Sequence, residues 1–158
     1  MARWAEIEAE DAQFAAKVRA LFDAHRHKVL ATLRKDGSPR VSGIEVAFSD
    51  GDIWMGSMPK SRKAADLARD PRLALHCTSD DPPADPTAWQ GDAKLAGRAV
   101  VVDDPARLKS MGEGGEGAGV LYQIDITEIV LTGMGDPPDH LDVRVWTPAR
   151  GLRTLRAE

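Results

Sequence analysis

The feature that most constrains the fold is a series of short strand-like segments separated by turn sequences in the first half of the chain. Residues 28–33 favour a strand, residues 35–39 read Lys-Asp-Gly-Ser-Pro and predict a turn, and residues 40–48 alternate enough to form a partner strand. A second turn at residues 49–52 leads into a short strand that ends at Ser57. Three consecutive antiparallel strands are therefore expected.

Strand-like segments continue through the second half of the chain, with few helices between them. The candidates are residues 72–78, 93–102, 120–131 and 141–146, and a helix through Lys109 is expected to begin at Pro105. No internal repeat or domain boundary is evident. We expect one domain, residues 1–158, of mainly β class: a small antiparallel β-barrel of six or seven strands with peripheral helices.

The N-terminal region predicts a helix at about residues 5–26. Apolar residues recur there at helical spacing, with charged residues between them: Ile7, Phe14, Val18, Leu21 and Phe22. We expect this amphipathic helix to pack against the barrel.

Residues 56–63 join a strand to a helix and combine small, hydroxylated and cationic residues. The first N–H groups of a helix lack internal partners and its dipole favours negative charge, so an anion can dock there. Lys60, Arg62 and Lys63 add positive charge, and Pro71 predicts that the helix ends near Asp70. The alternative interpretation is a solvated helix start that a serine merely caps.

Charge and cysteine content exclude several classes of protein. The formal charge is −4, and five of the 21 Lys and Arg residues fall within residues 60–72, which favours a small anionic ligand over a nucleic acid. Cys77 is the only cysteine, so no intramolecular disulfide can form and a cytoplasmic location is expected. No apolar run is long enough to predict a membrane span.

Two other sequence patterns, one of glycines and one of histidines with a cysteine, do not predict a binding site. Gly112, Gly114 and Gly117 match G-x-G-x-x-G, but a helix-like segment precedes them and a strand follows, which is the reverse of a dinucleotide-binding unit. We therefore expect residues 111–119 to form a surface loop. The four histidines and Cys77 lack metal-ligand spacing, so no metal site is expected.

The order of these segments resembles the pyridoxamine 5′-phosphate oxidase-like family of flavin-binding split barrels. The similar parts are the strand, Asp-Gly turn and strand, followed by Ser61-Arg62-Lys63 opening a helix that ends in residues 69–72. Residues 31–33, 36–39, 91–99 and 146–152 are also similar to family members. The resemblance implies a six-stranded antiparallel Greek-key split barrel of the FMN-binding type, paired as a homodimer with two flavin sites at the subunit interface.

Carried over by position, the resemblance implies a cofactor site. Arg62 and Lys63 would hold the phosphate of FMN, Gly56 and Ser57 would line its ribityl chain, and residues 40–45 would pass beside the ring. Two further residues would come from the partner subunit. The full expected set is Arg40, Ser42, Gly56, Ser57, Lys60, Ser61, Arg62, Lys63, Trp146 and Arg150.

The expected function is that of an FMN-binding oxidoreductase acting on an unknown small-molecule substrate or electron acceptor, without an assignable catalytic residue. The oxidase that names the family holds the vitamin phosphate with a lysine where this chain has about Glu45, so oxidation of pyridoxamine phosphate is not expected. Two alternatives stay open. One is a deazaflavin-dependent reductase, in which Lys60 would meet the acidic tail of the coenzyme, and the other is a non-catalytic flavin or haem carrier.

Overall fold

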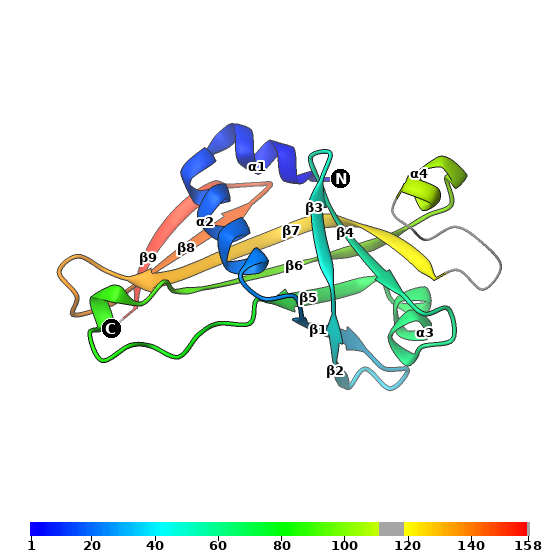
Figure 1. Cartoon of the computed structure of the whole chain (residues 1–158), viewed down its shortest axis with the longest axis horizontal. Coiled ribbons are helices and arrows are strands. Elements are labelled where there is room, and N and C mark those ends of the chain that lie inside the picture. Colours follow the sequence, from blue (N-terminus) through cyan, green and yellow to red (C-terminus); the bar gives the residue numbers. More distant parts are fainter. Residues whose placement is uncertain (111–118, 158) are drawn as a thin grey trace.

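The part of the chain that the computed structural model describes, residues 1–110 and 119–157, is built mainly from nine β-strands with four short α-helices (Figure 1). In chain order the elements are α1 (Trp4–Glu10), α2 (Ala12–Asp23), β1 (Lys28–Leu33), β2 (Pro39–Ile44), β3 (Val46–Ser49), β4 (Asp52–Ser57), α3 (Arg62–Arg69), β5 (Arg72–His76), a 3₁₀ turn (Pro86–Ala88), β6 (Asp92–Val102), α4 (Pro105–Ser110), β7 (Val120–Met134), β8 (Leu141–Thr147) and β9 (Gly151–Ala157). The expected mainly β class is confirmed, and the expected count of six strands is wrong.

The pairing order of the strands closes the sheet into a barrel. The hydrogen-bonded path runs β2-β1-β5-β6-β7-β4-β3, and every pairing is antiparallel. The two end strands of this path, β2 and β3, are separated in sequence only by Glu45. The sheet must therefore curl until its two edges meet at Glu45. Within the described residues these edges do not pair with each other, so the barrel is split along this seam.

The extra strands have two sources. Residues 40–48, expected as one strand, divide at Glu45 into β2, which pairs with β1, and β3, which pairs with β4. At the other end of the sheet, β9 pairs only with β8 and was not expected. Most of its residues are exposed, so this strand has no buried apolar face from which hydrophobic periodicity could predict it.

The predicted N-terminal helix is two helices. Asp11 adopts an extended conformation and its Oδ1 accepts a hydrogen bond from the Phe14 N–H at 2.8 Å, so it caps the start of α2. Its own N–H donates to the Ile7 carbonyl at 3.0 Å and closes α1. The expected apolar face is confirmed in the core: Ile7, Phe14, Val18 and Phe22 have no exposed surface.

Helix α3 lies at the end of the sheet away from β8 and β9, beside the β1–β2 hairpin and the end of β4 (Figure 1). It begins after Ser61 and ends before Asp70, as the sequence predicts. None of the helices in the described part of the chain is long and apolar enough to span a membrane.

Candidate functional site

Helix α3 separates two cavities that contain most of the predicted site residues. One lies at the barrel seam between the ends of β2 and β4, and we call it the seam cavity. The other lies between α3 and the β1–β2 hairpin, and we call it the arginine basin. Ser61 fixes the start of the helix, because its Oγ accepts a hydrogen bond from the Ala64 N–H at 3.2 Å.

The seam cavity has a volume of about 490 Å³, within the range of small-molecule sites. Its polar lining combines two serine hydroxyl groups and backbone with three ionisable side chains, those of His27, Glu45 and Lys63. Ser57 is buried at the end of β4, and its Oγ lies 2.7 Å from the Oγ of Ser61. The complete lining is His27, Gly43, Ile44, Glu45, Gly56, Ser57, Met58, Ser61 and Lys63.

The first turn of α3 supplies positive charge to the seam cavity. Arg62 and Lys63 occupy the first two helical positions, where backbone N–H groups have no acceptor within the helix. The Lys63 ammonium donates to the Gly43 carbonyl at 3.0 Å, which leaves two of its three protons for another acceptor. The cavity therefore offers an anion one ammonium group, the one hydroxyl proton that the Ser57–Ser61 hydrogen bond leaves free, and a helix N-terminus, while its lining also includes the Glu45 carboxylate.

The arginine basin is larger, about 640 Å³, and far more basic. Five of its lining side chains are cationic and two are carboxylates, which gives a formal charge of +3. It is lined by Arg34, Lys35, Asp36, Arg40, Arg62, Ala65, Asp66 and Arg69.

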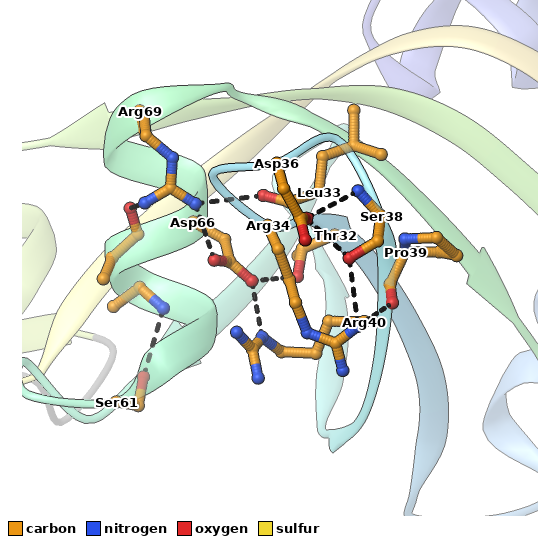
Figure 2. A network of polar contacts seen from close by, with 12 residues as sticks. Thr32, Leu33, Arg34, Asp36, Ser38, Pro39, Arg40, Ser61, Asp66 and Arg69 are labelled. Carbon is orange, nitrogen blue, oxygen red and sulfur yellow. Dashed lines mark hydrogen bonds and ion pairs between the residues drawn. The ribbon is translucent and has the colours of Figure 1, made fainter.

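Asp66 accepts hydrogen bonds from three side chains at the basin (Figure 2). Its side chain is only 3% exposed, and its Oδ2 accepts from Arg40 Nε at 2.6 Å and from the Thr32 hydroxyl at 2.9 Å. Its Oδ1 accepts from Arg69 Nη2 at 2.8 Å. The hydrogen bond from Arg40 is the main reason that the pKa of Asp66 falls to about 2, and burial opposes this shift. One buried carboxylate thus holds two guanidinium groups.

The structure divides the predicted site residues into separate groups. Gly56, Ser57, Ser61 and Lys63 meet at the seam cavity, whereas Arg40 and Arg62 line the basin. Ser42 lies on β2, two residues beyond Arg40 and half-buried like it, and Lys60 is exposed.

Trp146 lies on β8 and Arg150 in the turn that joins β8 to β9, and neither lines the seam cavity or the arginine basin. Trp146 is 3% exposed and its Nε1 donates to Glu10 Oε2 at 2.8 Å. Arg150 is exposed in the turn between the two strands. A role of these two residues in a partner's site stays a prediction.

Sequence reasoning missed Asp66, Arg34 and Arg69. Arg69 follows Asp66 by three residues, a spacing that brings side chains together on a helix. That local signal was available, but the contact to Arg40 joins residues 26 positions apart and depends on how α3 packs against β2.

Two other sequence expectations concern a metal site and the G-x-G-x-x-G motif. Within residues 1–110 and 119–157, no group of three or more His, Cys, Asp or Glu side chains could hold a metal ion. The G-x-G-x-x-G residues fall in 111–118, outside the described residues.

The chain is similar to known proteins in both sequence and fold. Residues 14–133 match the pyridoxamine 5′-phosphate oxidase family. No curated protein matches the chain.

The similarity to solved structures reaches over the whole chain. A pyridoxamine 5′-phosphate oxidase-related, FMN binding protein from Nostoc punctiforme PCC 73102 has a TM-score of 0.67 at 12% identity, covering 100% of this chain and 98% of its own. A heme binding protein from Mycobacterium smegmatis has a TM-score of 0.57 at 16% identity, covering 89% and 86%. An F420 reductase has a TM-score of 0.52 at 20% identity, covering 70% and 94%. At these identities the likeness establishes the fold, and the bound groups differ from one neighbour to the next.

Proposed function

Because the chain belongs to the pyridoxamine 5′-phosphate oxidase family, we propose that it is an FMN-binding oxidoreductase that holds the phosphate of FMN in the seam cavity. The observation that carries this proposal is the meeting of Ser57, Ser61 and Lys63 with the N-terminus of α3 in one cavity.

The donors of the seam cavity fit a phosphate. Phosphate oxygens accept hydrogen bonds from hydroxyl, ammonium and backbone N–H groups, and all three kinds line this cavity. Without an anion, Lys63 in the first helical turn opposes the helix dipole, at a cost of roughly a few tenths of a kcal/mol. A bound phosphate would turn this cost into an attraction.

The remainder of the seam cavity would hold the ribityl chain and one edge of the ring. Gly43 and Gly56 have no side chains, so the backbones of β2 and β4 can approach a flat ligand closely. Bound FMN supplies hydride or electron transfer, and the chain's own residues bind and orient it. Glu45 at this cavity accepts a hydrogen bond from Arg26 at 2.9 Å. Glu45 stands where the resemblance places the lysine that holds the vitamin phosphate, so oxidation of pyridoxamine phosphate is not proposed.

We also propose that two copies pair in the cytoplasm. A hollow of about 220 Å³ lies on the sheet over β1, β5 and β6, where Val29, 42% exposed, lies beside Ala31, Ala74 and Ala96, and the lining also includes His76, Lys94 and Glu128. A second copy covering this face would remove exposed apolar surface from water. Sedimentation analysis checks this: a dimer is expected, and a protein that stays monomeric at micromolar concentration would contradict it.

The deazaflavin coenzyme is the second candidate. Exposed Lys60 sits two residues beyond Met58 of the seam cavity and adds a cation that a longer acidic tail could meet. A carrier that binds flavin or haem without turnover is a third candidate.

A cofactor titration tests the proposal. The visible spectrum of the purified protein distinguishes oxidised flavin, deazaflavin and haem. We expect the apoprotein to bind FMN tightly and, after reduction by a nicotinamide donor, to pass electrons to an acceptor faster than free flavin does. Tight deazaflavin binding without FMN binding would overturn the choice of cofactor. Rates equal to those of free flavin would indicate a carrier.

A further inference from the structure

A smaller pocket adjoins the seam cavity on the side of β3 and β4. It has a volume of about 210 Å³, and its lining includes Glu45, Ala47, Trp54, Gly56 and Leu121. We call it the Trp54 pocket. Glu45 and Gly56 also line the seam cavity, so the two spaces meet at these residues.

Strand register places the walls of the Trp54 pocket on the face of the sheet that points away from the barrel core. Ala47 pairs with Trp54, and Gly56 pairs with Leu121, so these four residues share one face. Ile53, on the opposite face of β4, is part of the core. Trp54 and Leu121 are buried, yet neither belongs to the cluster of apolar side chains that fills the described part of the barrel. Gly56 has no side chain, which leaves space next to both of them.

Trp54 forms a fixed apolar wall of this pocket. Its Nε1 donates to the Ser49 carbonyl at 3.0 Å, so the indole has no free donor. The Arg107 guanidinium lies over the ring, 4.2 Å from its centroid, and pairs with Asp50 at 2.6 Å. These contacts hold the ring in place. A fixed aromatic wall beside Leu121 suits the apolar body of a ligand.

Glu45 is the one ionisable side chain among the described residues that line the Trp54 pocket. Its side chain is 54% exposed and accepts a hydrogen bond from Arg26 Nε at 2.9 Å, and His27 Nε2 lies 3.7 Å away. Arg26 is 78% exposed, and an exposed ion pair of this kind contributes little to stability. A cationic group of a ligand can therefore replace Arg26 at small cost.

We infer that the Trp54 pocket is the substrate subsite, and that it selects a small apolar molecule with a protonated amino group that Glu45 binds. This inference rests on the proposed function in placing the flavin ring in the seam cavity, next to Glu45 and Gly56. An engineered cavity of about 150 Å³ can hold benzene, so the pocket has room for one ring with a short side chain. An anionic ligand is disfavoured, because its charge would repel that of Glu45.

Three probes of matched size test the inference on protein saturated with FMN. Benzylamine, benzyl alcohol and benzoate share one ring, and at neutral pH the first is a cation, the second neutral and the third an anion. We expect benzylamine to bind about fivefold more tightly than benzyl alcohol, and benzoate to bind most weakly. NMR shift changes of the Gly56 amide and the Trp54 indole N–H measure the affinities and show where the probes bind.

Two variants separate the charge of the pocket from its shape. Glu45→Gln keeps the size of the side chain and should remove the preference for benzylamine over benzyl alcohol. Ala47→Leu fills the pocket and should weaken both probes about tenfold. Urea unfolding shows whether each variant remains folded. The matched control is Glu8→Gln, an exposed glutamate on α1, which should leave all three affinities unchanged.

The outcomes distinguish the inference from the proposed function. Benzoate binding as tightly as benzylamine, or a preference for benzylamine that persists in Glu45→Gln, overturns the inference while FMN binding stands. Absence of benzylamine binding to the folded, FMN-loaded protein overturns it as well. If FMN fails to bind but benzylamine binds beside Trp54 and depends on Glu45, the proposed function fails and the pocket stands as a site for an organic cation.

Discussion

The two sides of helix α3 offer an anion very different surroundings. On the seam side, one lysine, one glutamate, one histidine, two serines and backbone groups line a cavity with two glycines in its wall. On the basin side, four arginines and a lysine surround a hollow anchored on a buried aspartate. Neutral donors and bare backbone suit a largely neutral ligand with one charged end, whereas fixed guanidinium groups suit the charge itself. Neighbouring residues in the sequence, Arg62 and Lys63, therefore face different surroundings.

Removing the carboxylate beneath the basin should have the largest effect. Asp66→Ala leaves Arg40 and Arg69 without their shared partner, and we expect the free energy of unfolding to fall by about 2 to 4 kcal/mol. Asp70→Ala is the matched control, because the pKa of Asp70 is also lowered to about 2, mainly by Arg72, but this pair is more exposed. Its loss should stay below about 1 kcal/mol. Equal losses in urea unfolding would show that burial of Asp66 has no special effect.

The seam side can be tested separately by changing its cation. Lys63→Ala should weaken FMN binding roughly 10- to 100-fold, because a charge-assisted hydrogen bond contributes about 1.5 to 3 kcal/mol. Lys35→Glu on the basin side should leave FMN affinity within about twofold, since FMN has one phosphate. Quenching of flavin fluorescence measures both. If Lys35→Glu has the larger effect, the assignments of the two cavities are reversed.

The elements around α3 could be predicted from local signals. Ser61 caps the helix and Pro71 limits its end, and the Asp-Gly pairs at residues 36–37 and 50–51 mark the two turns. Gly37 and Gly51 both adopt positive φ, 83° and 74°, which explains why glycine follows aspartate in each turn.

Other parts of the fold and site depend on contacts between distant segments. The alternating pattern of residues 40–48 continues through Glu45, so only the different partners of β2 and β3 reveal the seam. The division of Arg62 and Lys63 between two cavities requires the orientation of α3 on the barrel. The role of Asp66 requires its contact with β2. None of these follows from spacing along the chain.

The pH dependence of stability should report the basin side. Because the pKa of Asp66 in the folded protein, about 2, is below the ordinary value of 3.8, its contribution is fully present above pH 4 and is lost as the pH falls to about 2. The expected loss is about 1 to 2 kcal/mol. Urea unfolding between pH 5 and pH 2 measures it, and Asp66→Asn should flatten this part of the profile. A profile that is the same for both proteins would contradict the account.

The most direct test of the central claim compares FMN with riboflavin, which lacks the phosphate. The account predicts that the protein binds FMN roughly 10- to 100-fold more tightly, that Lys63→Ala removes most of this difference, and that Lys35→Glu preserves it. Equal affinity for FMN and riboflavin would contradict the proposal that the seam cavity holds a flavin phosphate.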